Sequence, residues 1–375
     1  MQKQLRVEVV FGTRPEAIKM APVVKALTDS EEIDCRITVT AQHREMLDQV
    51  LTLFSIRPDH DLNLMRSGQT LTEITTRALT LLEEVFRREK PDLVLVHGDT
   101  ATTFAAALAA YYQQIPVGHV EAGLRTGNKY SPYPEELNRK LTGVIADWHF
   151  APTQTARDNL VREGVDPEKI FVTGNTVIDA LLATVRTGYA FPDPELSSIL
   201  AAEAGRRMIL VTTHRRENLG DPMRQIYQAL ADVIERFPDT YVLFPVHKNP
   251  EVRSVVNEML GQHPRVYLIE PLDYQPFANL MNRAYVILTD SGGIQEEAPS
   301  LGKPVLVVRH TTERPEAVEA GTVALVGTEY SRVQEALSRL LANKRDYQQM
   351  ACAVNPYGDG LASGRILDII RQYRI

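Results

Sequence analysis

A chain of 375 residues is long enough for two domains rather than one small core. Hydrophobic residues make up 44% of it and charged residues 24%, which is typical of a globular protein. The formal net charge of −7 argues against a nucleic acid or an anionic membrane surface as the partner. The two cysteines lie far apart, and no apolar stretch approaches the roughly 20 residues that cross a bilayer, so we expect a cytoplasmic protein.

Short apolar runs alternate with longer amphipathic stretches along the first half of the chain. Continuous apolar strands between helices indicate a parallel sheet that is covered on both faces. The predicted strands are 7–11, 37–40, 93–97, 117–120, 148–151 and 170–172, and the predicted helices are 16–28, 71–88, 101–112 and 154–163.

The same alternation restarts in the second half. Two successive strand–helix series predict two doubly wound α/β domains with a cleft between them, and we place the hinge near 174–179. The predicted strands are 209–212, 241–246, 266–269, 286–288, 305–308 and 323–326, and the helices are 222–237, 252–260, 276–282, 295–300 and 362–373.

The turn after the first predicted strand has the residues of an anion site. Gly12 allows a tight turn, Pro15 suits the first turn of a helix, and Arg14 and Lys19 supply two cations. In open α/β sheets, ligands bind where strands end and helices begin. The turn is therefore a candidate diphosphate site, although an ordinary strand–helix turn with surface charges explains it equally well.

A second candidate turn follows the predicted strand 286–288. Gly292 and Gly293 let the backbone approach an anion, and the helix that follows offers free amides and the positive end of its dipole. Glu297, about one turn into this helix, is placed to accept hydrogen bonds from ribose hydroxyls. Glycine at such turns is often needed for backbone geometry alone, but the position favours nucleotide binding.

Four residues are candidates for acid/base chemistry: Asp99, Glu121, Glu135 and His214. Taken alone, Asp99 is explained as a helix cap, and Glu135 as a helix-start carboxylate favoured by the dipole. Glu121 directly follows an apolar strand and is harder to explain structurally. If the two sheets face each other, these groups converge on the cleft in an acid/base arrangement.

No pattern in the sequence indicates a metal or another cofactor. The histidines are scattered without a His-x-x-x-His spacing, and the cysteines form no Cys-x-x-Cys pair. A Gly-x-x-x-x-Gly-Lys-Ser/Thr phosphate loop and a convincing Gly-x-Gly-x-x-Gly fingerprint are both absent from the sequence, which argues against an ATPase or an NAD dehydrogenase. We therefore expect no cofactor and no metal.

Seven segments in order along nearly the whole chain resemble the non-hydrolysing UDP-N-acetylglucosamine 2-epimerases. Each segment is modest alone, but the ordered set is specific. They are FGTRPE (11–16), AQHR (41–44), HGDT (97–100), HVEAGLRT (119–126), SGGIQEEAPSLG (291–302), TERPE (312–316) and NPYGDG (355–360).

This resemblance implies an α/β fold of the GT-B type: two Rossmann-like doubly wound domains with the active site in the interdomain cleft. The domains would be 1–175, joined by the C-terminal helix within 361–375, and 176–360, which would bind UDP. The resemblance also implies a homodimer that interconverts UDP-GlcNAc and UDP-ManNAc for cell-surface polysaccharides, with neither a nucleic acid nor a membrane as partner.

The resemblance also assigns residues, one position at a time. Asp99, Glu121, Glu135 and His214 match the catalytic or substrate-contacting set. The matches to substrate-binding positions are Arg14, Lys19, Leu272, Phe277, Ser291, Gly292, Gly293, Glu297 and Arg314, with Phe277 at the uracil site.

Some members of this family carry a second, activating UDP-GlcNAc site. The positions that match it here are Gln42, His43 and His247. However, Gly68 stands where those members are expected to have arginine, and Glu45 stands where they have glutamine. This departure predicts weaker cooperativity.

The resemblance implies a mechanism that avoids direct removal of an unactivated proton. Loss of UDP from carbon 1 acidifies the proton on carbon 2, so elimination gives 2-acetamidoglucal, to which UDP adds back. This requires anion binding for the diphosphate and acid/base groups on both faces of the ring. The alternatives are a GT-B glycosyltransferase, a hydrolysing UDP-GlcNAc 2-epimerase and a non-enzymatic nucleotide-sugar sensor.

Overall fold

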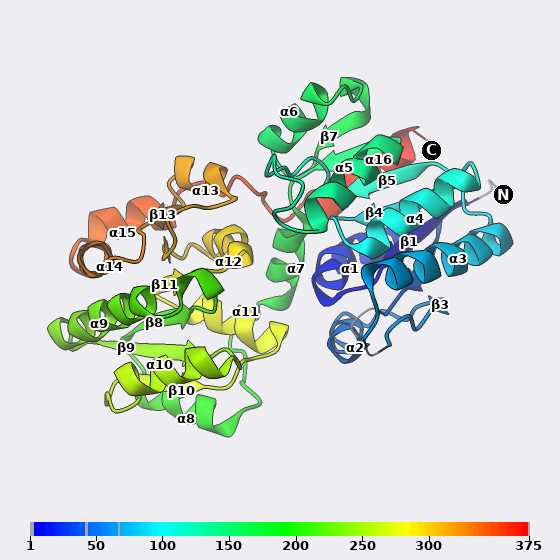
Figure 1. The fold of residues 1–375 in the computed structure, drawn as a ribbon. Helices are drawn as coiled ribbons and strands as arrows, with labels where there is room; N and C mark the ends of the chain where they lie inside the picture. The colour runs from blue at the N-terminus through cyan, green and yellow to red at the C-terminus, as the bar shows by residue number, and fades with distance from the viewer. Residues whose placement is uncertain (1–3, 42–43, 67, 374–375) are drawn as a thin grey trace. The chain divides into compact units, whose positions relative to one another are not determined.

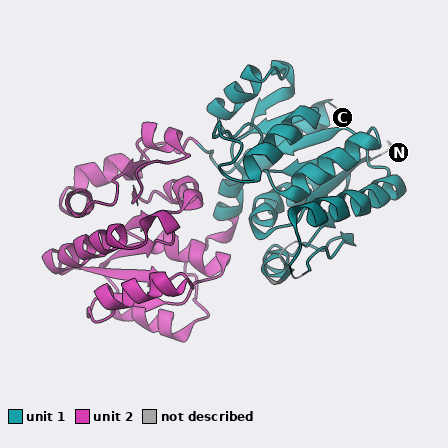
Figure 2. Cartoon of the chain, in the orientation of Figure 1, with its two compact units in different colours: residues 1–182, 357–375 teal, residues 183–356 magenta. Residues whose placement is uncertain are grey.

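The computed structural model describes residues 4–41, 44–66 and 68–373. The chain forms two compact units (Figure 2), residues 1–182 with 357–375 and residues 183–356. The return of residues 357–375 to the first unit places the C-terminal helix there. The domain bounds predicted above, 1–175 with 361–375 and 176–360, stay a prediction.

Unit 1 is built on a seven-stranded parallel sheet with the strand order β3-β2-β1-β4-β5-β6-β7 (Figure 1). The strands are β1 (Leu5–Phe11), β2 (Ile33–Val39), β3 (His60–Asp61), β4 (Leu93–His97), β5 (Val117–Val120), β6 (Trp148–Ala151) and β7 (Ile170–Val172). The helices are α1 (Arg14–Thr28), α2 (Arg44–Leu53), α3 (Leu71–Glu89), α4 (Ala101–Tyr112), α5 (Glu135–Ile145), α6 (Gln154–Arg162), α7 (Thr176–Thr184, which runs into unit 2) and α16 (Ala362–Tyr373).

The helices of unit 1 pack in two groups. Helices α3, α4 and α5 pack in series, and α1 packs against α2 and α16. The centre of the sheet, at β1 and β4, is mostly apolar and buried, and the alanine-rich helix α4 lies against α3 over it. Burial on both faces is what the continuous apolar strands predict.

Unit 2 repeats this design with a six-stranded parallel sheet in the order β10-β9-β8-β11-β12-β13. The strands are β8 (Arg207–Thr212), β9 (Thr240–Pro245), β10 (Val266–Ile269), β11 (Val286–Thr289), β12 (Val305–Val307) and β13 (Val323–Leu325). The helices are α8 (Pro194–Ala202), α9 (Asp221–Arg236), α10 (Pro250–Leu260), α11 (Tyr274–Arg283), α12 (Gly292–Glu297), α13 (Pro315–Glu319), α14 (Tyr330–Ala342) and α15 (Lys344–Ala351). Helix α9 packs between α10 and α14.

Both sheets have the Rossmann order, in which the strand sequence reverses between the first and the fourth strand of the series. The reversal lies between β1 and β4 in unit 1, and between β8 and β11 in unit 2. Ligands bind at such switch points because the connections diverge there and leave the carboxyl ends of the strands open. The switch points therefore position the candidate sites.

One charged residue lies inside the first sheet. Glu8 in β1 is fully buried, and the Thr38 hydroxyl donates a hydrogen bond of 2.5 Å to its Oε1. Its Oε2 has no hydrogen-bond partner among the described residues. Burial, together with the nearby charges of Asp59 and Glu89, raises the pKa of Glu8 from 4.5 to about 7. Folding therefore opposes the ionisation of this carboxyl.

Glu8→Gln is expected to remove a pH-dependent loss of stability. Because the folded-state pKa lies above the unfolded value, the cost of Glu8 is absent below pH 4.5, grows as pH rises, and is complete above about pH 7. The shift corresponds to roughly 3 kcal/mol. In urea titrations, the variant should exceed the wild type in free energy of unfolding at pH 8 more than at pH 5. Glu84→Gln on the exposed face of α3 is the control, and equal slopes against pH for all three proteins would contradict the prediction.

Candidate functional site

The switch point of unit 1 is held together by a buried carboxylate. Glu16 accepts hydrogen bonds from the backbone N–H of Gly12 at 3.0 Å and of Thr13 at 2.7 Å. It also accepts from the hydroxyls of Thr100 at 2.7 Å and Thr103 at 3.1 Å. Glu16 thus ties the turn after β1 to the turn after β4.

This arrangement changes how the first predicted anion site can work. The amides of Gly12 and Thr13 are already bonded to Glu16, so a diphosphate at this turn would depend on side chains. Arg14 is exposed and forms no ion pair with the described residues. Lys19, in contrast, forms an ion pair with Glu121. The predicted roles of Arg14 and Lys19 in substrate binding stay predictions.

Glu121 is the most constrained of the predicted acid/base residues. It follows β5 with a positive φ of 63°, a conformation that side chains other than glycine rarely adopt outside functional or strained sites. Its side chain is 8% exposed and contacts the Lys19 ammonium, and Asn175 donates a hydrogen bond to it at 2.9 Å. Burial alone would raise the pKa of Glu121, but the Lys19 charge and these hydrogen bonds lower it. The carboxylate is therefore ionised at neutral pH.

A buried histidine lies beside this carboxylate. The His97 Nε2 is 3.8 Å from Glu121 Oε2, and neither ring nitrogen has a hydrogen-bond partner among the described residues. Burial lowers the pKa of His97 to about 4, so its ring is neutral at pH 7. His119, on the neighbouring strand, contacts the carbonyl oxygen of Gly98 at 2.7 Å, and burial lowers its pKa to about 3. In the sequence, both belong to the scattered histidines that lack a His-x-x-x-His spacing.

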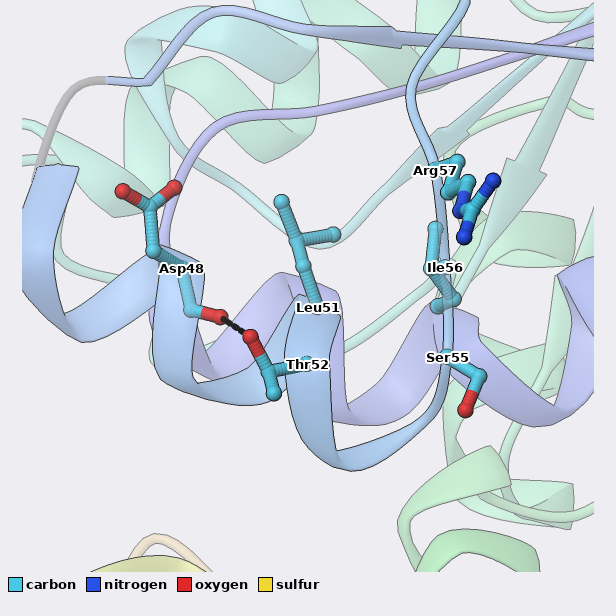
Figure 3. A pocket seen from close by; sticks show the side chains of 6 residues that line it. All are labelled: Asp48, Leu51, Thr52, Ser55, Ile56 and Arg57. Atoms are coloured by element: carbon cyan, nitrogen blue, oxygen red, sulfur yellow. Dashed lines mark hydrogen bonds between the residues drawn. The ribbon is translucent and has the colours of Figure 1, made fainter.

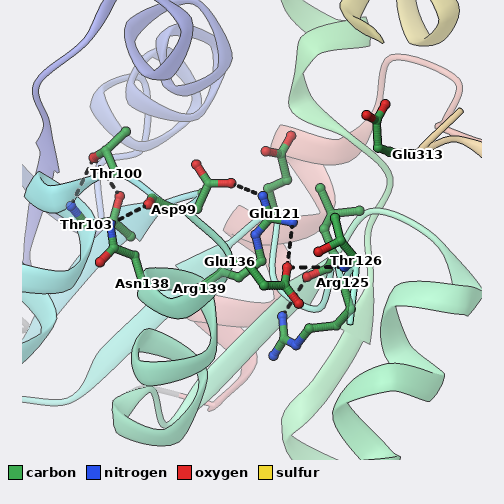
Figure 4. Close-up of polar contacts among 12 residues, drawn as sticks. Asp99, Thr100, Thr103, Glu121, Arg125, Thr126, Glu136, Asn138, Arg139 and Glu313 are labelled. Carbon is green, nitrogen blue, oxygen red and sulfur yellow. Dashed lines mark hydrogen bonds and ion pairs between the residues drawn. The ribbon is translucent and has the colours of Figure 1, made fainter. Parts of the chain in front are cut away.

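Asp99 is held by an arginine that sequence reasoning missed. Figure 4 shows the Asp99 carboxylate bonded to Arg139 of α5, whose other nitrogen lies 3.3 Å from Glu136. Glu136 is fully buried and accepts hydrogen bonds from the N–H of Thr126 and Gly127, both at 3.1 Å. The chain Asp99–Arg139–Glu136 therefore joins the β4 turn to the loop before α5. The i, i+3 spacing of Glu136 and Arg139 on one predicted helix start was the available signal.

Glu135 opens α5, as the sequence predicts, and its Oε2 atom is buried without a hydrogen-bond partner among the described residues. Its neighbour Glu136 takes the buried structural position instead. The two carboxylates at the helix start therefore differ: Glu136 is hydrogen-bonded to backbone amides, whereas one oxygen of Glu135 has no partner among the described residues.

At the switch point of unit 2, His214 lies against Asp290. The His214 Nδ1 is 3.1 Å from the Asp290 carboxylate, and its ring stacks on His247 with centroids 5.5 Å apart. His214 and His247 each lie two residues beyond the end of a strand, β8 and β9 respectively, and these neighbouring strands bring them together. The assignment of His247 to a second, activating site stays a prediction. The other two residues predicted for that site, Gln42 and His43, lie outside the described residues.

The second predicted anion site lies immediately after Asp290. The Ser291 amide donates to the Thr289 hydroxyl at 2.9 Å, so any amide contribution falls to Gly292 and Gly293 at the start of α12. A Cβ on Gly292 would lie 2.8 Å from the Arg314 guanidinium, which shows that glycine permits this close approach. Arg314 is oriented by Glu296, at 2.8 Å.

The remaining predicted contacts of unit 2 lie around the same sheet edge. Glu297 follows one turn into α12, and its Oε1 would be 3.4 Å from a Cβ on Gly293. Phe277 is half-buried on α11, and Leu272 is half-buried just before it. Their roles in binding stay predictions.

One pocket with a volume of about 400 Å³ lies elsewhere, on α2 (Figure 3). Within it, the Thr52 hydroxyl donates to the Asp48 carbonyl oxygen at 2.8 Å. It contains no predicted site residue. Its lining is Asp48, Leu51, Thr52, Ser55, Ile56 and Arg57.

Within residues 4–41, 44–66 and 68–373, no group of three His, Cys, Asp or Glu side chains is arranged to hold a metal ion. No helix in the same ranges is both long and apolar enough to cross a membrane.

Comparison with known proteins gives a consistent result over the whole chain. Residues 25–371 match the model of the family described as UDP-N-acetylglucosamine 2-epimerase. The UDP-N-acetylglucosamine 2-epimerase of Escherichia coli (strain K12) is 59% identical over 99% of this chain and 100% of its own.

Two solved structures extend the likeness to the fold. A crystal structure of a putative UDP-N-acetylglucosamine 2-epimerase from Listeria monocytogenes is 53% identical, with a TM-score of 0.94 over 99% of this chain and 97% of its own. The Neisseria meningitidis UDP-GlcNAc 2-epimerase bound to UDP-GlcNAc is 50% identical, with a TM-score of 0.84 over 98% of this chain and 100% of its own. The predicted fold class, two Rossmann-like α/β domains of the GT-B type, is confirmed.

Proposed function

The chain belongs to the UDP-N-acetylglucosamine 2-epimerase family, and from that premise we propose that it interconverts UDP-GlcNAc and UDP-ManNAc without hydrolysis. The observation that carries the proposal is the ionised, buried Glu121 at the switch point of unit 1. A carboxylate that is kept charged and shielded from water is suited to accept a proton from carbon.

The proposed reaction is an elimination followed by an addition. The bond between carbon 1 and the diphosphate oxygen breaks, and its electron pair leaves with UDP. The proton on carbon 2 passes to a carboxylate, and the electrons of that C–H bond form the carbon 1–carbon 2 double bond of 2-acetamidoglucal. A proton then arrives on the opposite face of carbon 2, and UDP adds back to carbon 1.

Three carboxylates are proposed to serve the two faces of the ring. Glu121 is charged and held by Lys19, whereas Asp99 is held by Arg139. Glu135 keeps one buried oxygen without a partner among the described residues. These distinct environments are what a pair of acid and base roles requires, since a group that removes a proton and a group that donates one need different surroundings.

Unit 2 is proposed to hold the nucleotide of the same substrate molecule. Gly292 and Gly293 leave room for a diphosphate beside the Arg314 guanidinium, which would neutralise charge on the departing UDP. Glu297 would accept hydrogen bonds from the ribose hydroxyls. The site would be completed by Phe277, Leu272 and Ser291. Arg14 of unit 1 would add a further cation.

We also infer a homodimer and a cytoplasmic location. Both cysteines, Cys35 and Cys352, are free, which suits a reducing compartment. The relative from Neisseria meningitidis was crystallised with UDP-GlcNAc, which supports the same ligand here. The product would supply ManNAc units for surface polysaccharides.

Turnover of UDP-GlcNAc alone in heavy water is expected to place deuterium at carbon 2 of UDP-ManNAc. The proton removed in the elimination leaves the sugar, and a solvent-derived one replaces it on the other face. Proton NMR of the products detects both the new sugar nucleotide and its labelling.

The same experiment separates the alternatives. Free ManNAc with UDP would indicate the hydrolysing epimerase, and turnover that requires an added acceptor would indicate a glycosyltransferase. Binding without any turnover would indicate a sensor. UDP-ManNAc carrying only protium at carbon 2 would contradict the elimination mechanism.

A further inference from the structure

Asp290 has no role in the proposed chemistry, yet its carboxylate accepts hydrogen bonds from three different residues. It is fully buried in the turn after β11. Its oxygens accept hydrogen bonds from the backbone N–H of His214 at 2.9 and 3.1 Å and of Arg215 at 2.9 Å, and from Asn218 Nδ2 at 3.2 Å. The ring nitrogen Nδ1 of His214 lies 3.1 Å from the same carboxylate.

These contacts determine which ring nitrogen of His214 carries the proton. Burial alone would raise the pKa of Asp290, but its hydrogen bonds from His214 and Arg215 lower it. An ionised carboxylate can only accept hydrogen bonds, so the short contact requires a proton on Nδ1. Nε2 is then the nitrogen that remains for a ligand, on a side chain that is 39% exposed.

The position of this pair in the chain connects it to the anion site. Asp290 immediately precedes Ser291, Gly292 and Gly293, and the turn after β8 that carries His214 adjoins it because β8 and β11 pair in the sheet. Two titratable groups contact the His214 ring: the Asp290 carboxylate, and His247, which follows β9. Burial, with the charges of His214 and of Arg253 in α10, lowers the pKa of His247.

We propose that Asp290 is a positioning residue that keeps a proton on Nδ1 of His214 and fixes the orientation of its ring, so that Nε2, once it is also protonated, donates a hydrogen bond to the departing diphosphate. The inference rests on the proposed function for its last step, but the tautomer of His214 does not depend on it. The buried carboxylate also stabilises the imidazolium, which is the form that donates from Nε2 while Nδ1 stays bonded. The pair supplies charge where the leaving group needs it.

The alternative is that Asp290 only joins the turns of β8 and β11. Asn218→Ala is the matched control, since it removes one hydrogen bond to Asp290 without touching the His214 ring. If Asp290 were only a structural link, both Asp290→Asn and Asn218→Ala would affect stability, and neither would change the ring of His214.

Nitrogen-15 NMR of the histidine rings in the full-length, ligand-free chain tests the tautomer, with His214 assigned by its loss in His214→Gln. We expect the Nδ1–H form at high pH in the wild type and in Asn218→Ala, and loss of this preference for Nδ1–H in Asp290→Asn. An Nε2–H tautomer in the wild type would overturn the proposal, and this result does not depend on whether any variant folds.

Steady-state turnover tests the second half. We expect Asp290→Asn to lower kcat by about 100-fold with KM for UDP-GlcNAc within about threefold, while Asn218→Ala keeps kcat within about threefold. Equal losses of kcat in the two variants would overturn the positioning role. If the wild type makes no UDP-ManNAc at all, the proposed function fails, and the NMR result still decides whether Asp290 sets the His214 ring.

Discussion

Glu121→Gln is expected to lower kcat by about 10²- to 10⁴-fold, the range in which a positioned acid or base contributes. Glutamine keeps the size of the side chain and one hydrogen-bond acceptor for Lys19 and Asn175, but it cannot take up a proton. The loss should therefore appear in kcat for UDP-ManNAc formation and in deuterium exchange at carbon 2. Both are measured by NMR on the same samples.

The substitution also removes the charge that pairs with Lys19, whose side chain is only 18% exposed. Breaking a buried ion pair on one side leaves an uncompensated charge and costs roughly 3 kcal/mol in free energy of unfolding. Stability and chemistry therefore have to be measured separately, by urea denaturation and by turnover.

A double variant separates the two effects. Glu121→Gln combined with Lys19→Met removes both charges, so it should recover much of the lost stability and none of the lost turnover. Glu163→Gln, at a carboxylate that is 38% exposed and pairs with Arg125, controls for loss of a carboxylate and should leave turnover unchanged. Turnover of Glu121→Gln within about tenfold of the wild type would rule out Glu121 as an acid or base.

The central strands of both sheets could be predicted because their residues are apolar without interruption. The predicted first and last residues agree with the observed ones in β4, β5, β6, β7 and β10. The two-residue edge strand β3 was missed, because His60 and Asp61 have no apolar periodicity and pair with β2 only through the backbone. Helix α8 was also missed: its stretch contains Pro192 and Pro194 and has little strand signal, but Pro194 starts the helix after the Asp193 cap.

The candidate site could be predicted by position but not by contact. The sequence places Lys19 in the helix that follows the first strand and Glu121 directly after a later strand, yet nothing in it shows that these residues, 102 positions apart, form an ion pair. Glu16 illustrates the same limit, because its spacing after Thr13 predicts a helix cap, whereas the structure adds the Thr100 and Thr103 hydroxyls from the next turn. Contacts of this kind depend on the strand order, which the alternation of elements alone does not specify.

The turn that precedes Glu16 leads to the second large effect. Gly12 is buried between Thr40 and Thr102, whose hydroxyls are hydrogen-bonded to each other at 2.8 Å. A Cβ at this position would lie 2.0 Å from the Thr40 hydroxyl and 2.5 Å from that of Thr102. Both threonines are fully buried, so neither can move aside without disturbing β2 or α4.

Gly12→Ala is therefore expected to lower the free energy of unfolding by about 3 kcal/mol, the upper range for an added methyl group in a packed interior. Turnover should fall as well, because the Gly12 amide is bonded to Glu16 and the displaced turn would carry Arg14 and Lys19 with it. Urea denaturation and product formation measure the two losses.

Gly364→Ala is the matched control: Gly364 lies exposed in α16 with nothing within 4 Å, so the same change should stabilise the helix by up to about 1 kcal/mol. Adding Thr40→Ala to Gly12→Ala removes the nearest colliding atom and should recover part of the stability. If Gly12→Ala and Gly364→Ala have the same free energy of unfolding, the turn can accommodate a Cβ at position 12, and glycine is not a steric requirement there.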